Sequence, residues 1–77
     1  MTENQIRLRT IARFLRLDVQ RVEDHIYLLL HDQTMPTLAR EDTLKLALGG
    51  LKDIENWCSS IRDTVRKCQM EGTVPKL

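Results

Sequence analysis

The chain has 77 residues, enough for one small domain, and its 12 basic and 11 acidic residues leave a formal net charge of +1. This balance argues against a generally basic protein that coats nucleic acid, because that mode of binding requires many phosphate contacts. No apolar run approaches the roughly 18 residues needed to cross a bilayer. We therefore expect a single soluble domain over residues 1–77 that does not bind membranes.

A domain of this size buries only about 60% of the surface of its unfolded chain. Small proteins therefore often need disulfides, a metal or a partner subunit. Cys58 and Cys68 match no ligand or disulfide pattern, so we expect reduced, buried thiols in a cytoplasmic protein. His25 and His31 do not share a helical face, and we expect no metal and no cofactor. Oligomerisation is the remaining means of stabilisation.

The first predicted element is a long helix that is capped by Thr2 or Asn4 and ends near His31. Its main apolar residues recur in alternating steps of four and three, which is typical of helices packed side by side. The residues of this predicted seam are Leu8, Ala12, Leu15, Val19, Val22, Ile26 and Leu29. Four further apolar residues lie off the seam: Ile6, Phe14, Leu17 and Leu28.

Residues 10–26 suggest a different reading of the same segment. They resemble the helix-turn-helix of winged-helix and response-regulator transcription factors at Ile11, Ala12, Leu15, Leu17, Asp18, Val22 and Ile26. The resemblance implies a break near residues 16–18, a three-helix fold and a recognition helix that begins at Asp18. The DNA-reading side chains of this alternative are Gln20, Arg21, Asp24 and His25.

Arginines also gather on one side of the first helix. Arg9, Arg13, Arg16 and Gln20 follow one another in steps of four, three and four. Guanidinium groups bind phosphates and carboxylates through a planar fork of donors. This side is either a binding surface for an acidic ligand or a solvated helix face.

The second predicted helix follows a break at Met35-Pro36-Thr37 and spans about residues 40–70, ending before Gly72. Its predicted seam is also unbroken and consists of Leu44, Ala47, Leu51, Ile54, Cys58, Ile61, Val65 and Cys68. Residues 71–77 are expected to form a flexible tail. Two helices of similar length, about 3–31 and 40–70, joined by about ten residues predict an all-α antiparallel hairpin.

One hairpin cannot bury all of these apolar residues. We expect Phe14, Leu17, Leu28, Leu46 and Trp57 at a subunit interface, in a four-helix bundle dimer or a higher oligomer. Gly49 and Gly50 are unusual, because each glycine within a helix costs about 1 kcal/mol relative to alanine. Gly50, Leu46 and Trp57 are predicted to form a notch for close helix packing or for a ligand.

A second resemblance involves residues 46–57, which read Leu-Ala-Leu, then Gly49-Gly50, Leu51 and an aromatic residue at Trp57, after Arg40-Glu41. This stretch is similar to the C-terminal helix of phage helical-hairpin proteins that sequester cyclic oligonucleotide signals of bacterial immunity. The resemblance implies an oligomer of hairpins that binds a negatively charged nucleotide between subunits.

No nucleophile with a base, phosphate loop or paired carboxylate is recognisable, so we expect no enzymatic activity. The sequence favours a small regulatory protein of phage or mobile-element type that associates with itself and inhibits or modulates a partner protein. Two alternatives are a helix-turn-helix DNA-binding regulator and a cyclic-nucleotide sponge. The candidate binding residues are Arg9, Arg13, Arg16, Gln20, Phe14, Leu17, Leu46, Gly50 and Trp57.

Overall fold

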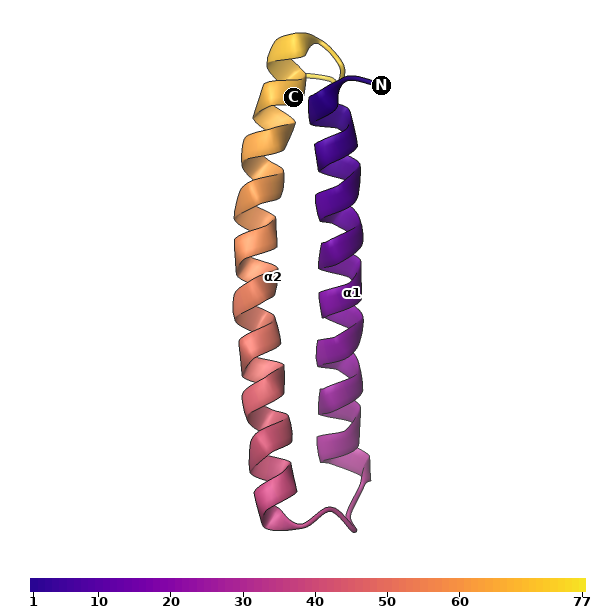
Figure 1. The fold of residues 1–77 in the computed structure, drawn as a ribbon, viewed down its shortest axis with the longest axis vertical. Helices are drawn as coiled ribbons and strands as arrows, with labels where there is room; N and C mark the ends of the chain where they lie inside the picture. Colours follow the sequence, from indigo (N-terminus) through magenta and orange to yellow (C-terminus); the bar gives the residue numbers. More distant parts are fainter.

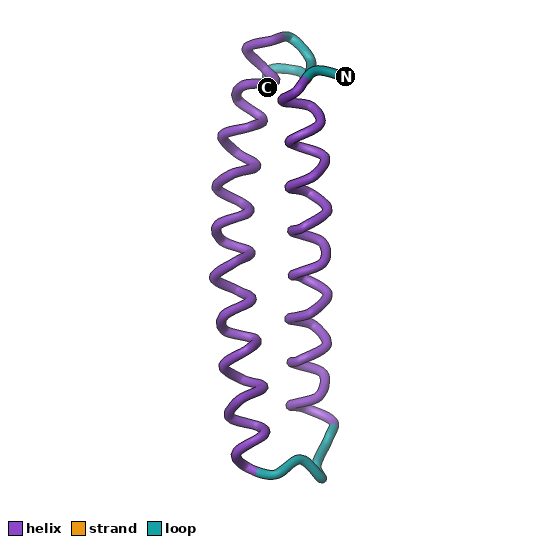
Figure 2. The backbone as a smooth tube through the Cα atoms, in the orientation of Figure 1, coloured by secondary structure: helices purple, strands orange, loops and turns teal.

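The computed structural model describes all residues, 1–77, and contains two α-helices and no strand. Helix α1 spans Glu3–His31 and helix α2 spans Thr37–Glu71. They run antiparallel, and both chain termini lie at the end opposite the connection (Figures 1 and 2). The molecule is a rod of 53 × 21 × 16 Å. The predicted all-α hairpin is confirmed, and the alternative break inside the first helix does not occur.

Helix α1 begins at a capping box. The Thr2 hydroxyl accepts a hydrogen bond of 3.2 Å from the backbone N–H of Gln5, and the Gln5 side chain accepts one of 2.9 Å from the backbone N–H of Thr2. These two bonds satisfy donors that a helix N-terminus otherwise leaves unpaired. At the same end of the rod, the Asn4 amide and the Thr2 hydroxyl donate hydrogen bonds to the Glu71 carboxylate of α2.

The connection between the helices is shorter than predicted, because α2 begins at Thr37 rather than near residue 40. Pro36 occupies the N-cap with an extended backbone, which its ring permits, and no helix breaker follows it. The Arg40 guanidinium donates hydrogen bonds of 2.7 Å to the carbonyl of Leu29 and 3.1 Å to that of Asp32. Arg40 therefore ties the first turn of α2 to the end of α1.

Helix α2 ends at Gly72, as the sequence predicts. Gly72 adopts the left-handed conformation, with φ 76° and ψ 14°, and its N–H is bonded to the carbonyls of Cys68 and Gln69. The N–H of Thr73 also bonds to the carbonyl of Cys68, at 2.9 Å. A glycine favours this termination because it has no Cβ to clash in the left-handed region.

The residues at the contact between the helices differ from the predicted seams. The observed interhelical seam consists of Leu8, Ile11, Leu15, Asp18, Val22, His25 and Leu29 on α1, and Thr43, Ala47, Gly50, Ile54, Trp57, Ile61, Thr64 and Cys68 on α2; all are buried or half-buried. Four of the seven residues predicted on α1 and four of the eight predicted on α2 are therefore correct. The others are wrong by one position: Ala12, Val19, Ile26, Leu44 and Leu51 are exposed, and Cys58 and Val65 are half-buried at the edge.

The error has a physical reason. In each helix, one half of the contact line and the apolar residues one position after its other half together form an unbroken stripe, so the four-and-three spacing fits two neighbouring faces about equally well. The structure uses the face that contains Asp18, His25, Gly50 and Thr64, where specific contacts form, among them the approach of Gly50 to Val22. The most apolar stripe of each helix consequently lies beside the hairpin contact.

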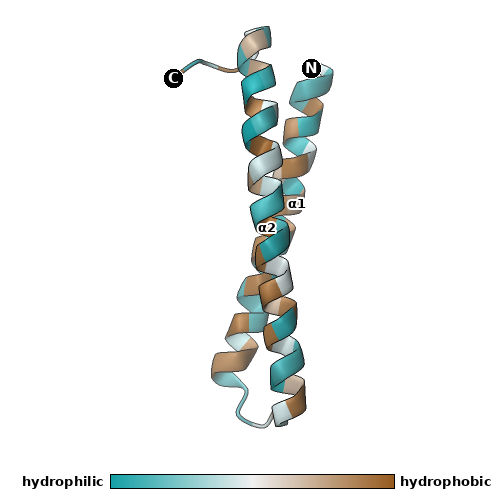
Figure 3. Ribbon diagram, turned by 90° about the vertical axis from the view of Figure 1, so that its left-hand side faces the viewer, coloured by the Kyte–Doolittle hydropathy of each residue, from teal (hydrophilic) through white to brown (hydrophobic).

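The core of the hairpin is thin. Five of the 77 residues are buried: Ile11, Val22, Ala47, Thr64 and Cys68. Apolar residues recur along the full length of both helices and alternate with polar ones (Figure 3). Neither helix contains a stretch of the length and apolarity that a membrane crossing requires.

Candidate interaction site

The largest hollow of the molecule is an open groove of about 710 Å³ along one side of the hairpin, between the middle of α1 and the first half of α2. Its lining residues are Asp18, Arg21, Val22 and His25 from α1, and Lys45, Leu46, Gly49, Gly50, Lys52 and Asp53 from α2. The groove exists because two glycines remove side chains from one wall. The groove brings together Leu46 and Gly50, two of the predicted binding residues, and Arg21 and His25, two of the predicted DNA-reading residues.

The two glycines have different surroundings. A Cβ on Gly50 would lie 2.6 Å from the Cγ2 of Val22, so the close packing of α2 on α1 excludes a side chain there. A Cβ on Gly49 would meet nothing within 4 Å. The close-packing interpretation thus holds for Gly50. Gly49 is instead an exposed helical glycine that no contact within the chain requires, next to Leu46, whose side chain is 60% exposed.

Trp57 lies in the seam at the far end of the groove, and both its ring and its indole N–H have partners within the chain. Its ring stacks on Phe14 with a centroid distance of 5.3 Å and an interplanar angle of 17°. Its indole N–H donates a hydrogen bond of 2.6 Å to the Asp18 carboxylate. The sequence predicts Phe14 and Trp57 at a subunit interface, but the two rings pack against each other within one chain. Phe14 remains 46% exposed at the edge of this pair.

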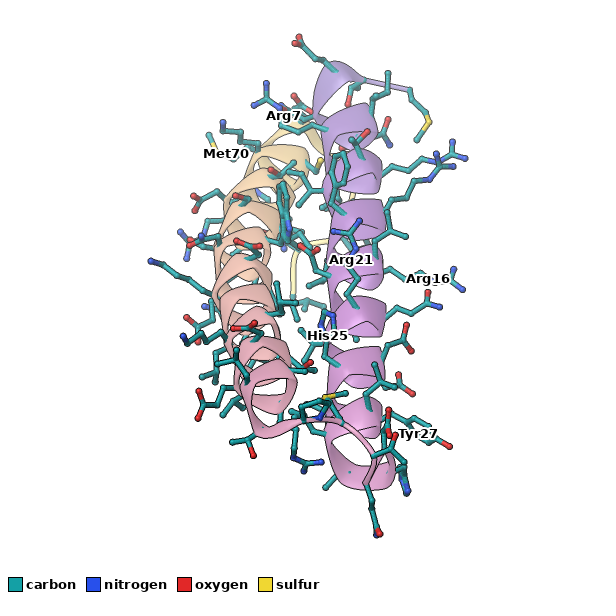
Figure 4. The ribbon with its side chains drawn as sticks, turned by 60° about the horizontal axis from the view of Figure 1, so that its bottom comes forward. Arg7, Arg16, Arg21, His25, Tyr27 and Met70 are labelled. Carbon is teal, nitrogen blue, oxygen red and sulfur yellow. The ribbon has the colours of Figure 1, made fainter.

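His25 extends into the space between the helices and lines the groove (Figure 4). Its Nδ1 atom is buried and has no hydrogen-bond partner. An unpaired buried polar atom is costly, and most such atoms in proteins are bonded to protein or water. The His25 side chain thus lines the groove, while its Nδ1 atom lies below the surface without a partner.

Three cationic side chains border the groove. Arg21 is 3.9 Å from Asp18, a pair that contributes little because the Arg21 side chain is 73% exposed. Lys45 and Lys52 form no ion pair within the chain. The Asp18 carboxylate is already engaged by Trp57, which leaves Asp53 as the only other acid of the lining. The groove thus combines an apolar wall at Leu46 with cations available to a carboxylate.

The predicted arginine face is outside the groove. Arg9, Arg13, Arg16 and Gln20 are all exposed, and none of the three arginines forms an ion pair within the chain. Arg16 projects away from α2 (Figure 4). A shallow hollow of about 390 Å³ lies beside it, lined by Arg16, Val19, Gln20, Glu23 and Asp24. Leu17 is 52% exposed and touches neither hollow.

The four residues of the DNA-reading alternative are not arranged as a recognition helix. They belong to the continuous α1, which has no turn at residues 16–18. Gln20 and Asp24 lie at the shallow hollow, while Arg21 and His25 line the groove. His25 is half-buried in the interhelical seam, and the other three side chains are exposed.

Comparison with protein-family models, with curated proteins and with solved structures finds no match for this chain. No group of three or more His, Cys, Asp or Glu side chains is placed so that it could hold a metal ion. The function of the protein is therefore inferred from the groove and from the exposed apolar residues. The fold and this site define a small helical hairpin that has a groove along one of its two long sides.

Proposed function

We propose that the protein is a non-enzymatic interaction protein that associates with itself and modulates a partner protein, which it binds through the groove beside Gly49. The observation that carries the proposal is the distribution of apolar side chains. Five residues are buried, whereas sixteen large hydrophobic residues are exposed. Single exposed hydrophobics are ordinary, but contiguous apolar patches mark sites of protein interaction.

The groove suits a polypeptide partner. Gly49 lets another backbone approach α2 closely, and exposed Leu46 offers an apolar contact next to it. Lys45 and Lys52 can pair with carboxylates at the rim, where charges favour specificity and association rate over affinity. An amphipathic helix with acidic residues beside its apolar face has this complementary chemistry.

The experiment is site-specific photo-crosslinking in the cells that express the protein. A photoreactive phenylalanine replaces Leu46 in the groove or, as the control, Arg66, whose side chain is 74% exposed on the outer surface of α2. We expect a discrete heavier adduct from the Leu46 position alone, and its loss when Gly49→Trp fills the groove. Equal labelling from both positions, or adducts of the chain with itself only, would contradict the proposal.

The DNA-binding and cyclic-nucleotide alternatives stay predictions from the sequence. Neither gains an argument from the geometry, because α1 has no turn at residues 16–18 and His25 of the DNA-reading set is half-buried in the interhelical seam. The arginine face is a row of separate exposed side chains without an enclosing site. The phage or mobile-element origin likewise remains a prediction.

A further inference from the structure

The side of the hairpin opposite the groove carries a second apolar surface, which we call the lateral face. It consists of Ala12, Val19 and Ile26 on α1 and of Leu44, Leu51, Cys58 and Val65 on α2, each one residue after a member of the interhelical seam. Antiparallel helices are related by a two-fold axis normal to the hairpin, so equivalent positions of both helices lie on the same side. All seven residues therefore form one continuous strip.

The groove lies on the other side by the same geometry. Arg21, Leu46 and Asp53 line it, and each precedes a seam residue by one position. The two sides differ in chemistry. The seven residues of the lateral face are all apolar, whereas the groove side is mixed and carries Arg21 and Asp53.

The lateral face completes the most apolar stripe of each helix. In the sequence, lateral residues such as Val19 and Leu51 alternate with seam residues such as Val22 and Ile54 in steps of four and three. Together they form one unbroken apolar stripe on each helix. In the hairpin alone this stripe is uncovered on one side, and Val19, Ile26, Leu44 and Leu51 are between 43% and 48% exposed. In a bundle of four helices, such a stripe points to the common axis.

The accessible area fits the same arrangement. The chain exposes 6179 Å², about 1,300 Å² more than the roughly 4,900 Å² of a typical folded monomer of its 9.0 kDa mass. Two chains that each covered this excess would bury on the order of 2,600 Å², within the roughly 2,000–5,000 Å² range of obligate homodimers. A second copy thus supplies an interface of the size that the excess surface requires.

Charged residues at the rim of the lateral face distinguish two orientations of a second copy. The flanking rows lie one residue after the remaining seam positions and consist of Arg9, Arg16, Glu23 and Leu30 on α1 and Leu48, Glu55, Arg62 and Gln69 on α2. Glu41, seven residues before Leu48, extends the α2 row toward the loop. If the loops lie at the same end, each α1 meets α2 of the second copy, so that Arg9 faces Arg62 and Arg16 faces Glu55 of that copy. The like-charge pair offsets the opposite-charge pair, so this orientation gains no net stabilisation from the flanking rows.

The opposite orientation removes the conflict. With loops at opposite ends, each helix packs antiparallel on its own copy. Arg16 then meets Glu23 of the second copy, and Glu41 meets Arg62 of the second copy. Each pair occurs twice by symmetry, and no like charges in the flanking rows meet. In both helices these pairs place the two-fold axis at the same level, next to Val19 on α1 and Leu51 on α2.

We infer that the lateral face is covered by a second copy of this chain, packed face to face with the loops at opposite ends and with the two-fold axis passing beside Val19 and Leu51. This inference rests on the proposed function and deepens it by naming the occupant of one side. The groove stays open on both outer sides of the four-helix bundle. Each dimer therefore presents two identical partner sites.

The first test is sedimentation equilibrium of the full chain together with two matched leucine variants. Leu51→Glu places a charge at the proposed axis, and Leu46→Glu places the same charge in the groove. We expect a dimer that Leu51→Glu converts to a folded monomer, as judged by circular dichroism, and that Leu46→Glu leaves intact. A monomeric parent protein, or a dimer dissolved by Leu46→Glu and not by Leu51→Glu, overturns the inference.

Disulfide trapping tests the orientation and does not depend on the glutamate variant folding. In a Cys58→Ser background the remaining native thiol, Cys68, is fully buried. Leu51→Cys should form a disulfide-linked dimer on mild oxidation, because each copy meets itself at the axis, while the control Leu46→Cys should not. Crosslinking between Val19→Cys and Leu51→Cys chains, without the Leu51→Cys self-link, would overturn the proposed orientation.

The two proposals fail separately. A monomer that still crosslinks a partner from position 46 refutes the dimer and leaves the proposed function. A dimer that passes the trapping test but yields no partner adduct refutes partner binding through the groove and leaves the dimer.

Discussion

The indole N–H of Trp57 donates a hydrogen bond of 2.6 Å to the carboxylate of Asp18 across the two helices. This contact joins residues 39 positions apart in the sequence and fixes the orientation of the ring that stacks on Phe14. A polar layer is thereby placed in the middle of an otherwise largely apolar seam. Such layers favour one register over others, as buried polar residues do in coiled coils.

Replacement of Asp18 should destabilise the hairpin. Asp18→Ala leaves the half-buried indole N–H without an acceptor, at a cost of about 1–3 kcal/mol. Asp18→Asn is the matched control, because its amide oxygen still accepts the bond, and it should lose less. Urea denaturation at one fixed protein concentration measures both free energies of unfolding. Equal effects of the two variants would show that the indole bond contributes nothing.

The two adjacent glycines should respond in opposite directions to the same substitution. Gly50→Ala brings a Cβ to 2.6 Å from Val22 and should cost about 1–3 kcal/mol as overpacking. Gly49→Ala meets nothing within 4 Å and should stabilise the helix by up to about 1 kcal/mol. Thermal unfolding followed by circular dichroism compares the variants. Adding Val22→Ala to Gly50→Ala should recover part of the loss, and a loss unrelieved by this smaller neighbour would contradict the packing explanation.

Arg40 should contribute to stability through the end of α1. Arg40→Ala removes the two hydrogen bonds to the carbonyls of Leu29 and Asp32. A hydrogen bond from a charged donor contributes no more than about 1.5–3 kcal/mol to stability. We expect a lowered Tm and faster amide hydrogen exchange in the last turn of α1. Arg40→Lys keeps the charge but not the planar fork, so it should restore little. Full restoration by lysine would indicate that the charge alone matters.

Asp32 should make the turn sensitive to acid. The Thr34 hydroxyl, at 2.7 Å, and then the Thr34 backbone N–H, at 3.1 Å, donate to its carboxylate and lower its pKa, and nearby Arg40 adds to this effect. A pKa that is lower in the folded than in the unfolded state stabilises the protein above the unfolded pKa of about 3.9, and this contribution is lost as pH falls through the folded pKa.

The measurement for this group is Tm as a function of pH for the native chain and for Asp32→Asn. The variant should be less stable at neutral pH, and the two curves should begin to converge as pH falls below the unfolded pKa of about 3.9 and should meet below the lowered folded pKa. Because the turn is accessible to solvent, we expect a small difference. Parallel curves over the whole range would show that ionised Asp32 does not stabilise the turn.

Local sequence features determined the helices and their ends. Thr2, one of the two predicted caps, begins α1, Gly72 takes the left-handed C-cap, and the absence of Gly and Pro keeps α1 continuous. These features act over a few residues, so they can be read from the chain directly. The sequence predicts the start of α2 near residue 40, whereas the helix begins at Thr37. Arg40 secures this first turn through bonds to the carbonyls of Leu29 and Asp32, which local sequence does not reveal.

Only the tertiary structure decided which face of each helix meets the other. Ala12 and Ile11 are adjacent and both apolar, and the same ambiguity separates Leu51 from Gly50, so periodicity alone could not choose between them. The choice depends on the Gly50–Val22 approach and the Trp57–Asp18 bond, which join distant residues and leave no local signal. The groove arises from the same choice, because turning the bare Gly50 toward α1 leaves Gly49 open beside it.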